Sequence, residues 1–536
     1  MDRFKSNLHS KPKNPSFLQN LISYVTQYCN TATIHGFKYI GEKGRFFVER
    51  LFWICTIIAI CLMCTYLVNQ RYYKWNTSPV IVSYETKETP IYKIPFPAVT
   101  VCSAIKIDPD YFNFTKSFFK KAKKIGLTQN EETLFDAMLL VCNLKKSFAK
   151  SFGIDNEIKR NFMDKDFYQE WFLRKCKRSY GITLTEEGFC YTFNMLHPKE
   201  ILRDSNEVIS LPKPDVKIHK WSFKHGYTPG VNLDNYPKRT YIAGISGGLL
   251  LDELFVNYSK LDYLCNEGVE GFKIALHHPS EFPNMDKRFR LPLNYISLVA
   301  VKPSMISVSE ELKNYHPKTR GCYFADEKYL SLYKLYTQQN CVTECLSNFT
   351  LRNCKCVPFW IPSITMALIL SSINCFIAGM TDTKICGPAK LECVKQSKLV
   401  YLSYDNRNQN DQCECLPACT SLSYDIEISQ TKWNWADLNQ LYVILNMTNV
   451  NYDPNISCYS RLLIYYKDLQ FLTSRRYEVY GALDFFSNVG GLLGLFIGFS
   501  LISKIELLYF LTLRIICNVI RYGRKLWSGE PNLVNN

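Results

Sequence analysis

A run of small and hydroxyl-bearing residues near the C-terminus is suited to binding a cation. The segment Gly490–Ser500 reads GGLLGLFIGFS and contains Gly490, Gly491, Gly494 and Gly498. Small residues on one helix stripe let helices approach closely, which suits a dimerisation face as well as a pore. Ser500 adds a hydroxyl just past the last glycine. Glu506 lies further along, and ionisable residues at membrane depth are usually functional. The pattern favours a pore-lining helix.

Other chemistries find little support in the sequence. It contains no Gly-rich phosphate loop, no HExxH and no nucleophile elbow, so we expect no enzyme activity, no cofactor and no metal site. The spacings Cys354-x-Cys356 and Cys413-x-Cys415 would suit zinc inside a cell, but outside the cell they favour disulfides. His277 and His278 are adjacent, which predicts a surface turn before Pro279 rather than a metal site.

Cysteine usage points to an oxidising compartment. Of the 22 cysteines, 17 lie between Cys102 and Cys458, a density that suits a region outside the cytosol. The central part of the chain carries six sequons for N-glycosylation, which begin at Asn76, Asn113, Asn257, Asn348, Asn446 and Asn455. We therefore expect the central part of the chain to be extracellular.

Two apolar segments are long enough to cross a bilayer. Leu51–Val68 holds 18 residues without a charge and reaches 23 when extended back to Phe46. At about 1.5 Å per residue this length crosses a hydrocarbon core of roughly 30 Å. The second span begins near Phe485. A third uncharged stretch, Trp360–Thr381, is rejected because it would place the cysteines from Cys386 onward in the cytoplasm.

Basic residues flank both spans, which predicts that both termini are cytoplasmic. The net charge of +16 has no continuous basic stripe, so the expected partner is the lipid bilayer and not nucleic acid. The fold class expected is a membrane protein with two transmembrane helices flanking a large disulfide-rich α+β extracellular domain. Its predicted parts are a cytoplasmic N-terminus (1–45), a first helix (46–68), an extracellular domain (69–479), a second helix with the pore (480–513) and a cytoplasmic tail (514–536).

Short β-branched and aromatic blocks support the α+β assignment. Pro95–Val101, Cys190–Phe193, Gly271–Leu276 and Tyr295–Val301 each read as strands bounded by turn-forming residues. Residues 130–180 are more helical and charged. A mixed domain of strands and helices follows.

Five separated motifs together resemble the degenerin/epithelial sodium channel family, and most of all its insect pickpocket members. They are His35-Gly36, PFPAVTVC at Pro95–Cys102, GFCYTFN at Gly188–Asn194, the cysteine spacing from Cys322 to Cys419, and the segment Gly490–Ser500. Each lies in order and on the expected side of a span. The resemblance covers nearly the whole chain.

The resemblance implies a sodium-selective, voltage-independent, amiloride-sensitive channel subunit in the plasma membrane, opened by an extracellular chemical or mechanical stimulus. It would assemble as a homo- or heterotrimer with related subunits and carry sodium as its permeant ion. The residues expected to act are Gly498, Phe499 and Ser500 as selectivity filter, His35 and Gly36 in a re-entrant gating segment, Ser487 and Asn488 at the outer pore, Gly490 and Gly491 on the pore helix, Gly494 at the amiloride position and Glu506 as a ring of negative charge.

The resemblance also implies a set of disulfides. The pairs are Cys102–Cys190, Cys322–Cys419, Cys341–Cys415, Cys345–Cys413, Cys354–Cys393 and Cys356–Cys386. Five cysteines of the region remain, namely Cys142, Cys176, Cys265, Cys375 and Cys458. Among these we expect a further bridge between Cys142 and Cys176.

The chain departs from the family pattern at several positions. Asn488 replaces an aspartate common in relatives, Lys504 is unusual near a filter, and the tryptophan that relatives stack on the residue equivalent to Tyr72 is absent. The uncharged stretch 363–380 exceeds the family spacing and reads as a lineage-specific loop or a gene-model error. Three alternatives stay open: a non-conducting auxiliary subunit of a heteromeric channel, a two-span scavenger-type receptor and an ATP-gated trimeric channel.

Overall fold

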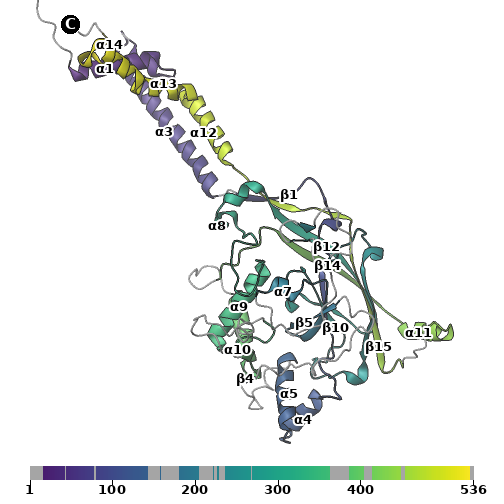
Figure 1. Ribbon diagram of the computed structural model, residues 1–536. Coiled ribbons are helices and arrows are strands. Elements are labelled where there is room, and N and C mark those ends of the chain that lie inside the picture. The colour runs from purple at the N-terminus through teal and green to yellow at the C-terminus, as the bar shows by residue number, and fades with distance from the viewer. Residues whose placement is uncertain are drawn as a thin grey trace, which may run out of the picture. The chain divides into compact units, whose positions relative to one another are not determined.

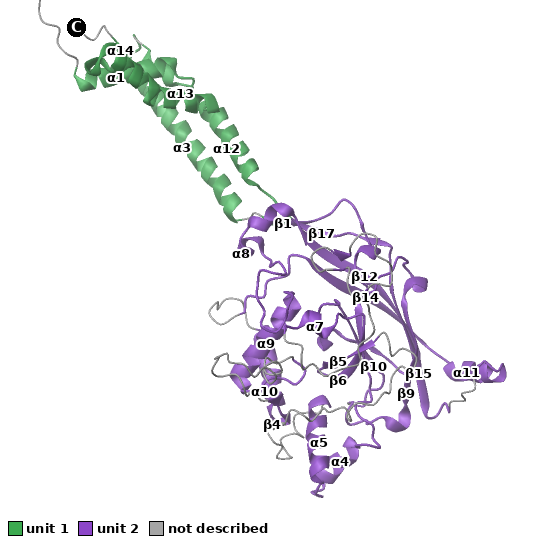
Figure 2. Ribbon diagram, in the orientation of Figure 1, with its two compact units in different colours: residues 1–81, 477–536 green, residues 82–476 purple. Residues whose placement is uncertain are grey.

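The computed structural model describes residues 16–42, 44–77, 80–142, 157–158, 180–203, 221–222, 226–227, 236–266, 268–361, 385–403, 413–447 and 453–530. The chain forms two compact units, one of residues 1–81 with 477–536 and one of residues 82–476 (Figure 2). Cys176, Cys375 and the uncharged stretch 363–380 lie outside the described residues.

A long twisted sheet is the backbone of the second unit (Figure 1). Its strand order is β1-β17-β12-β15-β9, and β14 pairs with β12 beside this path. The longest strand, β12, is antiparallel to β14 and parallel to β15. The strands are β1 (Val80–Tyr84), β9 (Leu249–Asn257), β12 (Tyr295–Val308), β14 (Ser421–Lys432), β15 (Ser457–Tyr466) and β17 (Ser474–Glu478).

A second, smaller sheet packs inside the same unit in the order β11-β10-β3-β6-β5. Its strands are β3 (Ala98–Cys102), β5 (Tyr180–Thr185), β6 (Gly188–Phe193), β10 (Phe272–His277) and β11 (Phe289–Leu291). The four strands predicted from β-branched and aromatic blocks are therefore confirmed, as β3, β6, β10 and β12. Two-stranded ribbons complete the β-structure: β2 (Thr89–Pro90) with β16 (Gln470–Phe471), β4 (Glu157–Ile158) with β13 (Ile385–Cys386), and β7 (Trp221–Ser222) with β8 (Gly226–Tyr227).

One hydrophobic core joins the two sheets. Val99 and Val101 of β3 and Ile274 of β10 lie in it together with Val299 of β12 and Leu462 of β15, all of them buried. Alternate residues of β3, Val99 and Val101, enter this core, and the residues between them are also buried, because both faces of this strand are covered. The core fixes the frame on which the helices of this unit are mounted.

Helices cover the unit at its periphery (Figure 1). The helix α5 starts at a capping box, in which Thr128 and Glu131 satisfy each other's backbone N–H groups. The helices of this unit are α4 (Phe114–Ala122), α5 (Gln129–Val141), α7 (Pro198–Ile201), α8 (Pro317–Arg320), α9 (Gln338–Cys354), α10 (Leu391–Ser403) and α11 (Trp435–Ile444).

Seven disulfides tie these elements together in the described part of the chain. The six pairs that the family resemblance implies are all present, and five of them form a ladder along α9, α10 and the segments beside them. The expected Cys142–Cys176 pair is wrong. Cys142, at the end of α5, is bonded instead to Cys265, whose Cα lies 4.4 Å away. The two cysteines are 123 residues apart, so only the tertiary fold brings them together. Cys458 is buried in β15 and forms no disulfide in the described part of the chain.

Replacing either Cys142 or Cys265 by serine should lower the thermal stability of the full-length protein by the same amount. A native disulfide of this kind contributes about 2–5 kcal/mol. The double replacement should cost no more than either single one, because both remove the same bond. Fluorescence-detected thermal unfolding of the protein in detergent measures this. A Cys142→Ser variant as stable as the parent would contradict the assigned pair.

The prediction of a surface turn at the two histidines is wrong. His277 ends β10 and is buried, and its Nε2 lies 2.9 Å from Thr100 Oγ. His278 is buried next to it, with its Nδ1 2.7 Å from Ser280 Oγ. Burial lowers the pKa of His277 to about 4 and that of His278 to about 3, so both are neutral at physiological pH. They serve the packing of the sheet edge.

The first unit consists of helices from both ends of the chain. They are α1 (Phe17–Thr31), α2 (Phe37–Gly41), α3 (Phe47–Thr77), α12 (Ala482–Ile497), α13 (Leu501–Leu511) and α14 (Leu513–Tyr522). Helix α3 is long and apolar enough to cross a membrane and continues nine residues beyond Val68. The segment from α12 to α14 passes the same test only as a bent pair, with a 70° bend at the break after Ile497. Helices α3 and α12 pack side by side (Figure 1).

Candidate functional site

The break between α12 and α13 falls on the predicted selectivity filter. Gly498 follows the last residue of α12 with a φ of +70°, in the left-handed region that favours glycine. Ser500 is the N-cap of α13, and its Oγ accepts a hydrogen bond from the N–H of Ser503 at 3.2 Å. The Gly-Phe-Ser sequence thus ends one helix and starts the next. The N–H of Gly498 still donates to the carbonyl oxygen of Gly494, and the carbonyl oxygen of Ser500 accepts from the N–H of Lys504, so within the described residues only the carbonyl oxygens of Gly498 and Phe499 lie outside the helical hydrogen-bond pattern.

The His-Gly motif lies directly against this break. The backbone N–H of His35 donates to the carbonyl oxygen of Ile497 at 3.0 Å, which satisfies a carbonyl at the end of α12. The imidazole ring covers Gly498 so closely that a Cβ there would lie 2.8 Å from it. Gly36 has a φ of +86°, and a Cβ at that position would lie 3.0 Å from Ile57 Cδ1 of α3. Both glycines are therefore required by backbone conformation and by close approach.

A chain of oxygen atoms runs from the filter serine to Glu506. Ser500 Oγ lies 3.1 Å from Ser503 Oγ, which lies 2.9 Å from Thr33 Oγ. Thr33 Oγ and Thr33 N donate to Glu506 Oε2 at 2.8 and 3.2 Å. Sequence reasoning found Ser500 and Glu506 but missed the two residues between them. The available signal was spacing: Ser503 stands three residues after an N-cap serine, and Thr33 stands two residues before His35.

The small residues of α12 form a face with open space beside it in the single chain. Ser487, Gly490, Gly491 and Gly494 are exposed. Within the described residues, no heavy atom lies within 4 Å of a Cβ built on any of the three glycines, apart from the helix itself and sequence neighbours. Asn488 turns its amide to the helix backbone, donating to the carbonyl oxygen of Asp484 at 2.7 Å. The exposed face is shaped for the close approach of another helix.

The outer ends of α3 and α12 are joined by aromatic rings. Trp75 stacks on Phe485 with ring centroids 4.9 Å apart, and Tyr72 contacts the same ring edge-on at 6.2 Å. The partner of Tyr72 within this unit is therefore Phe485, two residues before Ser487. Sequence reasoning did not anticipate this contact, because it joins residues about 410 positions apart.

At the other end of the unit, α1 packs against the segment that follows α13. Asn20 is buried and donates to the carbonyl oxygen of Lys525 at 3.0 Å, and it accepts from Ser528 Oγ at 2.7 Å. The ring of Tyr24 lies 5.5 Å from that of Trp527. We call this contact the terminal clasp, meaning residues 17–31 against residues 510–530. It places the segment that precedes His35 on the chain that follows the filter.

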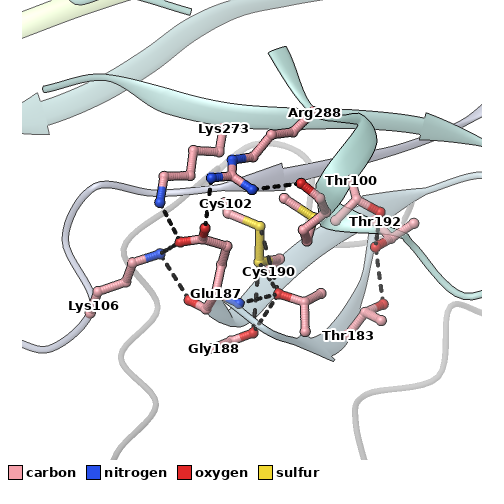
Figure 3. Close-up of a disulfide and its surroundings, with 12 residues drawn as sticks. Thr100, Cys102, Lys106, Thr183, Glu187, Gly188, Cys190, Thr192, Lys273 and Arg288 are labelled. Carbon is pink, nitrogen blue, oxygen red and sulfur yellow. Dashed lines mark hydrogen bonds and ion pairs between the residues drawn. A yellow bond between two sulfur atoms is a disulfide. The ribbon is translucent and has the colours of Figure 1, made fainter. Parts of the chain in front are cut away.

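A charge cluster surrounds the Cys102–Cys190 disulfide in the second unit (Figure 3). Glu187 lies at the β5–β6 turn. One of its carboxylate oxygens accepts hydrogen bonds from Lys273 Nζ at 2.6 Å and from Lys106 Nζ at 3.2 Å. Arg288 lies 3.8 Å from the other oxygen. Burial raises the pKa of Glu187, but the two lysines outweigh it and leave the pKa at about 2. The cluster ties three separate segments of the smaller sheet to one turn.

The sequons occupy accessible positions. Asn76, Asn348, Asn446 and Asn455 are exposed, while Asn113 and Asn257 are half-buried. Asn113 also caps α4, where its Oδ1 accepts from the N–H of Lys116 at 2.8 Å. A glycan attaches through the amide nitrogen, so the cap remains compatible with modification.

The described residues combine an apolar helix long enough to cross a membrane, a bent helix pair broken at a Gly-x-Ser sequence and a disulfide-rich domain, which points to a membrane protein. The family profile described as "Amiloride-sensitive sodium channel" matches residues 28–510. The chain therefore belongs to the amiloride-sensitive sodium channel family, a family of ion channels and not of enzymes.

Among its relatives are pickpocket proteins. Pickpocket protein 28 of Drosophila melanogaster is 26% identical over 516 residues, covering 92% of this chain and 79% of the relative. Pickpocket protein 11 of the same species is 25% identical, covering 94% of this chain and 79% of the relative. Acid-sensing ion channel 1C of Danio rerio is 22% identical, covering 96% and 88%. The chain is a cation channel subunit of the degenerin type and is similar to insect pickpocket subunits.

Proposed function

We propose that this chain is a sodium-selective channel subunit of the plasma membrane, in which residues 498–500 form the selectivity filter. The single observation that carries the proposal is the break at Gly498–Ser500, which leaves the carbonyl oxygens of Gly498 and Phe499 outside the helical hydrogen-bond pattern of the described residues and follows a helix face of small residues. Three such faces around one axis would line a pore and bring three sets of filter oxygens together. The assembly would be a trimer of this chain or of this chain with related subunits, with both termini in the cytoplasm.

Gating and block are assigned to the same helix. Ser487 and Asn488 lie at its outer end, where Ser487 would control closure and Asn488 would give a weaker cation attraction than aspartate. Gly494 would line the site of amiloride block. Opening would be independent of voltage and driven by an extracellular chemical or mechanical stimulus acting on the disulfide-rich domain.

Replacing Ser500 by cysteine should make the current sensitive to thiol-reactive silver or methanethiosulfonate reagents and should lower the sodium-to-potassium permeability ratio. The reason is that the Ser500 hydroxyl would face the permeant ion, and a thiol is a poor ligand for sodium. Voltage-clamp recording with sodium and potassium exchanged in the bath measures both effects, alone and with a related subunit. Ser503→Cys, which changes a buried serine in the same turn, is the accessibility control. A conducting Ser500→Cys channel with unaltered ratio and no thiol sensitivity would remove these residues from the filter.

A non-conducting auxiliary role is the second candidate, and one observation favours it. Lys504 is exposed on α13, four residues after Ser500. Three lysines facing a lumen would oppose cation flow, whereas one among three different subunits would be tolerated. Current only on co-expression with a related subunit, and current from Lys504→Gln alone, would support this role.

A further inference from the structure

The order of protons along the oxygen chain below the filter follows from its chemistry. The Glu506 carboxylate only accepts hydrogen bonds, so Thr33, at 2.8 Å, must donate its hydroxyl hydrogen to it. Thr33 Oγ can then only accept from Ser503, at 2.9 Å. Each hydroxyl has one hydrogen, so the Glu506 carboxylate fixes the direction of every hydrogen bond in this series of oxygen atoms.

The same reasoning fixes the filter serine. Ser503 has given its hydrogen to Thr33, so the Ser500 hydroxyl must donate to Ser503 across 3.1 Å. One lone pair of Ser500 Oγ accepts the N–H of Ser503 at 3.2 Å. The second lone pair is left for a ligand, and the hydroxyl hydrogen points away from it.

We propose that Thr33 and Ser503 are positioning residues for ion selection, which transmit the negative charge of Glu506 to the oxygen of Ser500. This inference rests on the proposed function of residues 498–500 as the filter. A hydroxyl that donates toward a charged acceptor has a more strongly polarised oxygen. A stronger ligand field favours the smaller, more strongly hydrated cation, so the chain would favour sodium over potassium.

The N-terminal segment contributes one residue, Thr33, to this series of hydrogen-bonded oxygen atoms. Without the Thr33 hydroxyl, Ser503 is free to donate to Ser500 instead. The Ser500 hydrogen would then be free to rotate toward the ion, where it opposes a cation. Ser503 is fully buried and Thr33 keeps its backbone N–H bond to Glu506 at 3.2 Å, so removing one hydroxyl changes the proton order with little effect on packing.

The test is the sodium-to-potassium permeability ratio of Thr33→Val, measured by reversal potential under voltage clamp with surface labelling. One neutral hydrogen bond contributes about 0.5–1.5 kcal/mol, so the ratio should fall about two- to thirteen-fold. The permeability ratio of Ser503→Ala should fall by a similar factor, and that of Thr33→Ser should equal the parental ratio. The matched control is Thr31→Val, because that hydroxyl bonds only within α1, to Gln27 O at 2.9 Å and Tyr28 O at 3.3 Å.

A second measurement separates positioning from direct ion contact. Glu506→Gln removes the charge that orders the chain, so adding Thr33→Val to it should change the ratio no further. A parental ratio in conducting Thr33→Val or Ser503→Ala channels would overturn the inference and leave the channel function intact. By contrast, an absence of sodium current from the parent chain, alone and with related subunits, would count against the proposed function itself.

Discussion

Replacing Gly498 by alanine should abolish most of the current while the protein still reaches the cell surface. At a φ of +70°, alanine is strained by about 1–2 kcal/mol. Its Cβ would also lie 2.8 Å from the His35 ring, so the ring or the backbone must move. Since 1.4 kcal/mol is a factor of ten in an equilibrium, we expect at least about a ten-fold loss of macroscopic current.

Two comparisons separate strain from collision. Gly321 has a φ of +70° and a ψ of +24°, close to the values of Gly498, and a Cβ there would meet Arg476 Nη1 at an ordinary 3.5 Å, so Gly321→Ala carries the positive-φ strain without a clash. It should conduct far better than Gly498→Ala. Adding Gly498→Ala to a His35→Ala channel should cost less than adding it to the parent, because the ring is gone. Equal losses in both backgrounds, normalised to surface protein, would show that the His35 ring does not constrain the filter.

Replacing Glu187 by glutamine should strongly destabilise the disulfide-rich unit. Lys106 and Lys273 are nearly buried and both point at this carboxylate (Figure 3). Removing one partner of a buried ion pair leaves an uncompensated charge, at a cost of about 3–5 kcal/mol. The full-length protein in detergent should therefore unfold several degrees lower, with less protein at the cell surface.

The matched control is Glu427→Gln. Glu427 pairs with Lys467 at 2.8 Å on an exposed surface, where an ion pair contributes little. Its unfolding temperature should stay at the parental value. If the two variants unfolded alike, the cluster around Glu187 would have no special role in stability.

The same cluster sets a pH dependence. The folded pKa of Glu187 is about 2, below the value of 4.5 expected for an exposed glutamate. Its contribution to stability is therefore complete above about pH 4.5 and is lost as the pH falls toward 2. The free energy of unfolding of Glu187→Gln should therefore depend less on pH over this interval than that of the parent, as measured by acid unfolding.

Local patterns in the sequence were enough for part of the fold. The apolar run that became α3 and the strand blocks that became β3, β6, β10 and β12 reflect short-range preferences, whereas the helix break at Gly498–Ser500 was not predicted. The physical causes of these preferences, namely side-chain periodicity and backbone conformation, depend on residues that are adjacent in the sequence. The resemblance to a known family supplied the disulfide ladder, which spacing alone cannot assign.

Long-range contacts could not be read in the same way. The Cys142–Cys265 bond, the burial of His277 and the link from Thr33 to Glu506 each depend on how distant segments pack. Thr33 and Glu506 are 473 positions apart, and no residue next to either of them in the sequence predicts their contact. The tertiary fold determines such contacts, so a single sequence does not predict which distant residues meet.

The terminal clasp has a consequence for how the protein is made. Asn20 bonds to Lys525, 505 residues later, so α1 cannot find its partner until almost the whole chain has been synthesised. Until then His35 lacks part of the packing that precedes it in the chain. The terminal clasp therefore forms among the last steps of biogenesis, and a chain truncated before residue 525 should lack a partner for its N-terminal helix as well.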